Sequence, residues 1–264
     1  MTLAPPEQVP AGAARPTITA PDGIALAVGL CSAAAWAALF VARLNGLVVA
    51  AALGVLSAAA VLERRRELAT LPVITALFAV LTSVPVLMQL WPAPLLLAVC
   101  AGLLLDRSRA SWLGRGELGG HVAAWILVVV AVSAGALVAW WYIARPDVSD
   151  LPRLPAGLHP ALLVGAVVAW AACNAAAEEL YFRGALQYEL VRGLGSAGVV
   201  VQALAFGAMH LHGFPRGWFG VGLAAVYGLM TGALRQRARG LLAPWIAHVA
   251  ADLTIVAIRV VALG

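Results

Sequence analysis

Two adjacent glutamates stand at the end of a long apolar run in this chain. The run, residues 160–177, contains one polar side chain, Asn174, before Glu178 and Glu179. A carboxylate inside a membrane helix costs at least ~2.5–3.5 kcal/mol, so ionisable residues there usually face a polar interior and have a function. Glu179 and Arg183 are four residues apart on one helix face, which predicts an ion pair. Glu178 is turned away by ~100° and is left without an assigned partner.

Two histidines in later apolar segments have useful neighbours at helical spacing. Phe206 precedes His210 by four residues, so its ring is expected to pack beneath the imidazole. Asp252 follows His248 by four residues, where a carboxylate can accept a hydrogen bond and fix the imidazole tautomer. A single helical histidine is more often a core residue than a catalyst. Together with Glu178, however, the two histidines form a candidate set.

These groups have the chemistry that amide hydrolysis needs. A base must take a proton from water, and donors must stabilise the oxyanion that forms on the scissile carbonyl. The expectation is catalysis without a cofactor. The alternative is a zinc ion held by Glu178, His210 and His248 with an open water position. A different class of function, a proton relay in a transport or immunity protein, would also use buried Glu and His. Asn174 lies four residues before Glu178 and is expected to support it.

The composition excludes a soluble globular domain. Of the 264 residues, 63% are hydrophobic and 11% are charged, against ~45–50% and ~25% in soluble domains. The net charge of +5 comes from basic residues between the apolar runs, as the positive-inside rule expects, and does not indicate nucleic-acid binding. The three cysteines lie in apolar segments without metal-ligand spacing and are interpreted as core residues. The expected partners are the lipid bilayer and a membrane-associated peptide or protein substrate.

Nine apolar segments approach the ~20 residues that a spanning helix needs. They cover 24–42, 46–62, 71–90, 95–105, 122–143, 160–190, 197–210, 218–234 and 241–261. Because 95–105 is short, the prediction is an all-α polytopic membrane helix bundle of eight or nine transmembrane helices. Pro85 is expected to kink the third segment. Residues 106–120 are expected to form a loop or a helix in the membrane interface.

The arginines between the segments predict an orientation. If every segment crosses, most basic loops fall on one side, with Arg64, Arg65, Arg66, Arg107, Arg109, Arg115, Arg192, Arg235, Arg237 and Arg239. The positive-inside rule makes this side cytoplasmic, so the N-terminus is expected in the cytoplasm and the C-terminus outside. The Pro- and Ala-rich residues 1–21 are expected to be a disordered tail and not a cleaved signal peptide. The expected location is a bacterial plasma membrane.

Three ordered motifs resemble those of a known family. The segments are Glu178-Glu179-Leu180-Tyr181-Phe182-Arg183, Phe206-Gly207-Ala208-Met209-His210 and His248-Val249-Ala250-Ala251-Asp252. They resemble the EExxxR, FxxxH and HxxxN/D motifs of the CPBP (Abi) family of intramembrane proteases, which is related to the type 2 CAAX prenyl endopeptidases. The resemblance covers roughly residues 158–261, and the earlier helices match only in hydropathy.

The resemblance implies a role for each motif residue. Glu178 would activate water with help from His210, and Glu179 would pair with Arg183. His248 and Asp252 would stabilise the oxyanion, although the CAAX endopeptidases typically have Asn at the last position, and an ionised Asp252 cannot donate a hydrogen bond. The family has been described as both metal-dependent and glutamate-dependent, and we favour the glutamate type.

The expected organisation has three parts. Residues 1–21 form the tail, 22–157 the N-terminal transmembrane helices and 158–264 a catalytic CPBP-like helical core. The expected function is an intramembrane endopeptidase that cuts membrane-associated proteins or peptides. The alternatives are the zinc-dependent form of the same hydrolase and a non-catalytic or proton-relay membrane protein. The substrate's identity does not follow from the fold.

Overall fold

The computed structural model describes residues 23–63, 65–105, 113–146, 157 and 159–263. Within these ranges every regular element is a helix. Five helical stretches are long and apolar enough to cross a membrane: Gly23–Phe40 (α1), Gly120–Ala144 (α6), Pro160–Leu194, Gly217–Ala238 (α10) and Leu242–Val261, which is most of α11 (Leu242–Leu263). The expected all-α membrane bundle is confirmed, and the chain is an integral membrane protein. The number of eight or nine spans stays a prediction.

The other apolar helices are shorter than a full span. They are α2 (Gly46–Leu62), α3 (Arg66–Thr82), α5 (Ala93–Leu105) and α9 (Ala197–Met209). The stretch Pro160–Leu194 consists of α7 (Pro160–Glu178), a π-helix η2 (Glu179–Leu186) and α8 (Gln187–Leu194). The expected tail, residues 1–21, and residues 106–112 of the expected interfacial segment lie outside the described residues.

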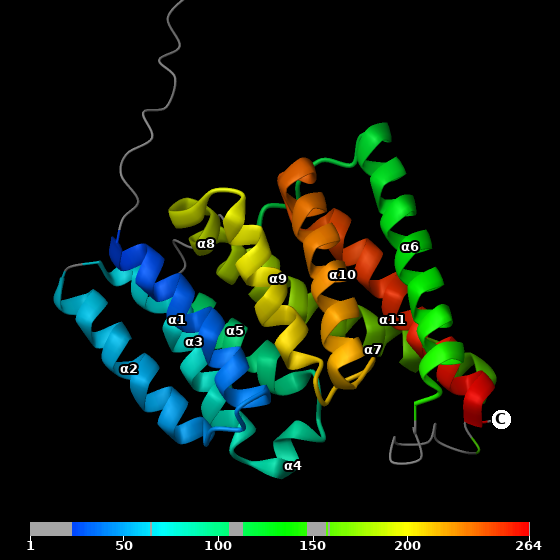
Figure 1. Ribbon diagram of the computed structural model, residues 1–264, viewed down its shortest axis with the longest axis horizontal. Coiled ribbons are helices and arrows are strands. Elements are labelled where there is room, and N and C mark those ends of the chain that lie inside the picture. The colour runs from blue at the N-terminus through cyan, green and yellow to red at the C-terminus, as the bar shows by residue number, and fades with distance from the viewer. Residues whose placement is uncertain (1–22, 64, 106–112, 147–156, 158, 264) are drawn as a thin grey trace, which may run out of the picture.

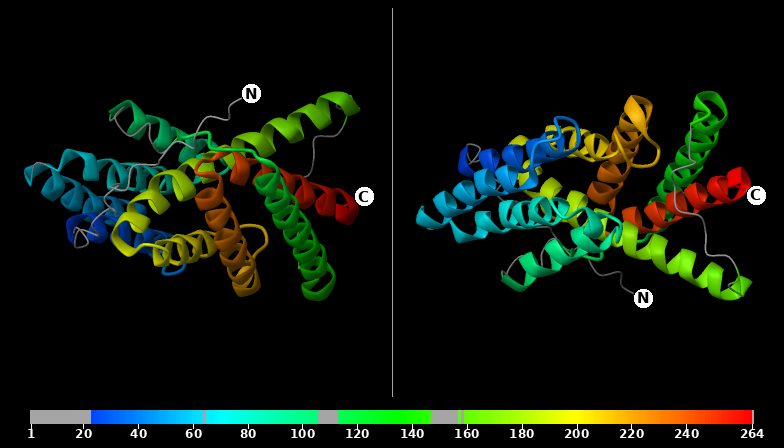
Figure 2. Two further views of the ribbon diagram at one scale, coloured as in Figure 1. Left: turned by 90° about the horizontal axis from the view of Figure 1, so that it is seen from above. Right: turned by 90° about the horizontal axis from the view of Figure 1, so that it is seen from below.

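The helices are arranged around the stretch that carries the paired glutamates. In Figures 1 and 2, α1, α2, α3 and α5 form one side of the molecule, and α6, α10 and α11 form the other. Helix α1 packs on α8 and α9, and α5 packs on α7. On the opposite side α9 packs on α10, and α7 packs on α11. The motif-bearing helices are therefore central.

The segment expected at 71–90 is two helices and not one kinked helix. Helix α3 begins at Arg66 and ends at Thr82, and a short helix α4 (Pro85–Met88) follows. Proline has no backbone N–H, and its fixed φ suits the first position of a helix. Pro85 therefore starts α4, and the expected kink is wrong.

Small residues allow α9 and α10 to approach closely. A Cβ on Gly207 would lie 2.7 Å from the carbonyl oxygen of Val221, and one on Gly228 would lie 3.0 Å from the Cα of Ala203. Membrane helices pack through such small residues because lipid supplies no hydrophobic force between them. Gly207 lies within the FxxxH motif, so this packing also fixes where His210 stands relative to α10.

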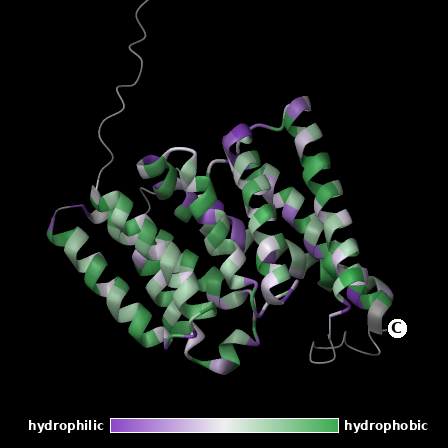
Figure 3. Ribbon diagram, viewed as in Figure 1, coloured by the Kyte–Doolittle hydropathy of each residue, from purple (hydrophilic) through white to green (hydrophobic). Residues whose placement is uncertain are grey.

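The main hydrophobic core joins the N-terminal helices to the motif-bearing helices. Its central ring, Trp36 of α1, stacks on Phe78 of α3 with centroids 4.9 Å apart and contacts Phe182 of η2 at 4.6 Å. Figure 3 shows apolar residues along most of each helix and hydrophilic residues mainly at helix ends and inside the bundle. The cysteines, expected in the core, are exposed: Cys31, Cys100 and Cys173.

Candidate active site

The paired glutamates lie where the helix changes type. Helix α7 ends at Glu178, η2 begins at Glu179, and the N–H of Gln187 bonds to the carbonyl of Phe182, five residues back. Such π-turns occur frequently at functional sites. Glu178 is 4% exposed, Glu179 1% and Arg183 0%, so all three side chains face the interior of the bundle.

The predicted pair of Glu179 and Arg183 is confirmed. Arg183 Nη1 lies 2.9 Å from Glu179 Oε1. The guanidinium also donates to the Thr231 hydroxyl of α10 and stacks 4.3 Å above the centre of the Phe206 ring. Paired and hydrogen-bonded in this way, a buried charge can be tolerated. Arg183 thereby connects η2, α9 and α10 at the site.

His248 of α11 lies between the two glutamates. Its Nδ1 is 2.7 Å from Glu179 Oε1, and its Nε2 is 3.5 Å from Glu178 Oε2. The expectation that Asp252 would hydrogen-bond His248 is wrong, because Asp252 Oδ1 lies 3.8 Å from His248 Nε2, the distance of an ion pair and not of a hydrogen bond. The i, i+4 spacing brings Asp252 near the imidazole, but the packing of α11 on α7 gives Glu179 the hydrogen bond.

Asp252 is held by Asn174. The Asn174 amide donates to Asp252 Oδ2 at 2.9 Å, although the sequence suggested a bond to Glu178 or a backbone carbonyl. Asn174 Oδ1 in turn accepts from the indole N–H of Trp91 at 2.6 Å. Trp91 was not among the predicted site residues, because it follows α4 in a proline-rich turn and has the pattern of an interfacial residue. The two bonds fix the Asn174 amide with its donor toward Asp252.

His210 stands at the end of α9. Its ring packs on Phe206 with centroids 4.7 Å apart, as predicted, and its Nδ1 lies 3.0 Å from the Phe206 carbonyl. A carbonyl only accepts, so Nδ1 carries the hydrogen, and in a neutral ring Nε2 is the acceptor. The Phe206 ring also contacts His248, at 6.0 Å. Within the described part of the chain, no hydrogen bond or ion pair joins His210 to Glu178.

Tyr181, interpreted from the sequence as a packing residue, anchors the glutamate motif to the N-terminal helices. Its hydroxyl accepts from the Trp36 indole N–H at 2.9 Å and lies 2.6 Å from Thr75 Oγ1. The single proton of Thr75 goes to the Leu71 carbonyl, so Tyr181 donates to Thr75. Nothing in the sequence distinguished this tyrosine, because its partners lie 106 and 145 residues away.

Tyr181→Phe should lower the free energy of unfolding by about 1–3 kcal/mol, because Trp36 is left with an unpaired buried N–H. The measurement is denaturant unfolding of the purified protein in detergent. Tyr142→Phe is the control, since Tyr142 is 70% exposed. Equal stability of the two variants would contradict the anchoring role.

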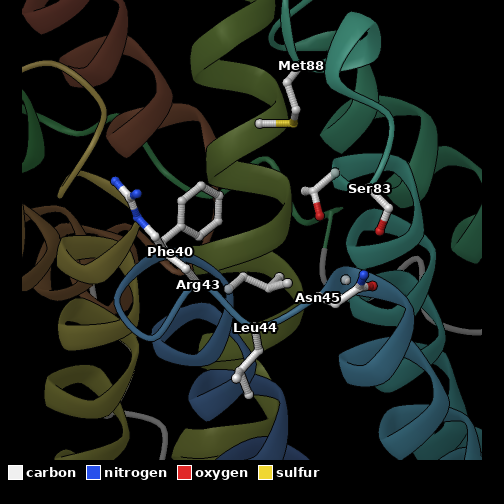
Figure 4. Close-up of a pocket in the computed structure, with 9 residues that line it drawn as sticks. Phe40, Arg43, Leu44, Asn45, Ser83 and Met88 are labelled. Carbon is white, nitrogen blue, oxygen red and sulfur yellow. The ribbon is translucent and has the colours of Figure 1, made fainter.

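A separate cavity of about 330 Å³ lies near the ends of α1 and α3. Its lining includes Phe40, Arg43, Asn45 and Ser83, and Figure 4 shows the Arg43 guanidinium on the Phe40 side, away from Asn45 and Ser83. Arg43 lies 3.3 Å from the Nε2 of His212. None of the motif residues lines this cavity.

A zinc site was the alternative for the motif residues. Among the residues that the structure describes, no group of three or more His, Cys, Asp or Glu side chains has the arrangement of a metal site. The two ring nitrogens of His248 face carboxylates, with Glu179 on Nδ1 and Glu178 on the Nε2 side. Zinc bound by Glu178, His210 and His248 would thus require these side chains to rearrange.

Comparison with known proteins gives one match. Residues 160–254 match the family model of the type II CAAX prenyl endopeptidase, Rce1-like. No curated protein and no solved structure matches the chain. The matched part contains all three motifs, from Glu178 to Asp252, and its family consists of membrane proteases of the CAAX type. The suspected relationship is confirmed for this part of the chain.

Proposed function

Starting from the match of residues 160–254 to the Rce1-like family, we propose that this chain is an intramembrane endopeptidase. It hydrolyses peptide bonds in membrane-associated proteins or peptides. The observation that carries the proposal is the meeting of Glu178, Glu179 and His248 inside the bundle, with the imidazole 2.7 and 3.5 Å from the two carboxylates. Such a cluster is costly in a membrane unless it has a task.

In the proposed reaction Glu178 is the general base. Its carboxylate takes a proton from water while the water oxygen attacks the scissile carbonyl carbon. His210 assists, because its Nε2 is free to accept a hydrogen bond from the same water. The proton then passes to the leaving nitrogen as the C–N bond breaks, which leaves a carboxylic acid and an amine.

The other motif residues prepare this step. His248 is the proposed donor to the oxyanion. As an imidazolium it gives its Nδ1–H to Glu179, which orients the ring, and keeps the Nε2–H for the oxyanion. Asp252 accepts from Asn174 and is better suited to holding α11 against α7 than to donating to the oxyanion. The departure from Asn at this position therefore leaves oxyanion stabilisation mainly to His248.

The test is cleavage of a panel of membrane-anchored peptides by purified protein in liposomes, with products identified by mass spectrometry. The panel includes prenylated and unprenylated members, and Glu178→Gln protein gives the background rate. Wild-type activity that persists under a zinc chelator is expected for the glutamate mechanism. Activity lost under chelator and restored by zinc would replace it with the metal-dependent alternative. Cleavage equal to background on every peptide would count against the protease.

The proposed orientation places the N-terminus in the cytoplasm of a bacterial cell. Helices α8 and α10 both end on the side of the bundle where α1 begins (Figure 1). The sequence at these two helix ends carries exposed arginines, among them Arg192, Arg237 and Arg239, as the positive-inside rule expects. Tags on the two termini, treated with protease in intact cells, test this. Only the C-terminal tag should be removed, and loss of the N-terminal tag alone would reverse the orientation.

A further inference from the structure

A line of buried polar side chains leaves the site along η2 and α8. Gln187 follows Arg183 by four residues, is fully buried, and donates from Nε2 to the Gly232 carbonyl at 3.0 Å. Gln202 of α9 is also fully buried. Both polar atoms of Gln202 and the Oε1 of Gln187 have no hydrogen-bond partner among the described residues. Three unpaired amide atoms therefore lie inside one small region of the bundle.

The two glutamine oxygens converge beside Gly232. A Cβ built on Gly232 would lie 3.0 Å from Gln187 Oε1 and 3.2 Å from Gln202 Oε1. It would also lie 2.7 Å from Val199 Cγ1, so a larger residue would crowd this region. Two carbonyl oxygens only accept hydrogen bonds. A small donor with two hydrogens is needed to satisfy both, and water fits that description.

The same line continues to the catalytic carboxylates. Thr231, next to Gly232, accepts from the Arg183 guanidinium. Arg183 Nε and Glu179 Oε2 are buried and have no hydrogen-bond partner within the described ranges. A buried unpaired polar group is costly, and ordered water is the usual partner of such groups. A series of unpaired groups on neighbouring buried residues is thus typical of a hydrated path.

A purely structural role for Gln187 and Gln202 does not account for their unpaired amide atoms. Glutamines that only join helices would bond to each other or to backbone groups across the interface. Gln187 does this once, through Gly232, but Gln202 does not. The fully buried Gln202 therefore needs a partner that the protein itself does not supply.

We infer that Gln187 and Gln202 bind internal water beside Gly232 and pass it along Arg183 to the Glu178–Glu179 pair. The ligand is water, the second substrate of hydrolysis, which lipid otherwise excludes from the site. The use of this water rests on the proposed protease function. The binding of the water does not.

Binding is tested by X-ray radiolysis, in which hydroxyl radicals formed from bound water label neighbouring side chains. The reporter is Phe206, which is 1% exposed and lies 4.3 Å from the Arg183 guanidinium. Wild-type protein without substrate should show labelled Phe206, and Gln202→Met, which keeps the side-chain shape, should lower the labelling severalfold. Gln236→Met is the control on the exposed face of α10. Unlabelled Phe206 in the wild type, or equal labelling of Phe206 in Gln202→Met and Gln236→Met, would overturn the inference.

The delivery of this water to the Glu178–Glu179 pair is tested by peptide cleavage with the same proteins. Gln202→Met should lower kcat about tenfold with KM unchanged, and Gln236→Met should have no effect. Gln187→Met is the second variant, in case Gln202→Met does not fold. An unchanged kcat in a folded Gln202→Met protein would refute the supply route. If the wild type cleaves nothing, the protease proposal fails, while the radiolysis result still decides whether water binds.

Discussion

Glu178→Gln should lower kcat/KM for peptide cleavage by about 10²–10⁴-fold, the usual contribution of a general base. Glutamine keeps the size of the side chain but cannot take a proton from water. The change should leave the fold intact, because Glu178 Oε2 has no hydrogen-bond partner among the described residues and lies 3.5 Å from His248 Nε2. Initial rates at several substrate concentrations separate this loss of rate from a loss of binding.

The control for this variant is Glu117→Gln. Glu117 has a side chain that is 64% exposed and lies 3.7 Å from Arg239, far along the chain from the motifs. The Glu117→Gln protein should cleave at the wild-type rate. Thermal unfolding should show that Glu117→Gln and Glu178→Gln are both folded. Glu178→Gln protein that cleaves within twofold of wild type would exclude Glu178 as the base.

Arg183→Met should lower the free energy of unfolding by about 3–5 kcal/mol, because removing one partner of a buried pair leaves an uncompensated charge. Arg183 is fully buried and lies 2.9 Å from Glu179. The variant also loses the hydrogen bond that Arg183 donates to Thr231. Denaturant titration in detergent, followed by helix content, measures the change.

Two further variants separate charge from packing. Arg239→Met should cost less than about 1 kcal/mol, because Arg239 and its partner Glu117 are 81% and 64% exposed and 3.7 Å apart. The double variant Arg183→Met with Glu179→Gln removes both charges and should recover part of the lost stability. If Arg183→Met lowers the free energy of unfolding no more than Arg239→Met does, the buried pair does not stabilise the fold.

The sequence predicted the contacts that depend on helix periodicity alone. Glu179 with Arg183, and Phe206 with His210, are i, i+4 pairs, and both contacts are present. The limits of α2, residues 46–62, were also predicted, from the apolar run alone. In the structure Asn45 caps this helix at its start. Local geometry decides all of these features.

The contacts that the sequence could not predict depend on how distant helices pack. The bond of His248 to Glu179 in place of Asp252, and that of Asn174 to Asp252, require the packing of α11 on α7. Trp91 reaches Asn174 from 83 residues away. Similarly, Pro85 could end a helix, kink one or begin one, and only the observed packing of α3 and α4 decided among these.

The anchoring of Tyr181 has a consequence for protein production. A fragment that starts at Pro160 would hold every motif of the family, and domain boundaries drawn from sequence families would recommend it. It would lack both hydrogen-bond partners of the Tyr181 hydroxyl and the indole that holds Asn174. Such a fragment should be recovered only when the N-terminal helices are co-expressed as a second polypeptide, so the recognisable part of this chain is smaller than its autonomous folding unit.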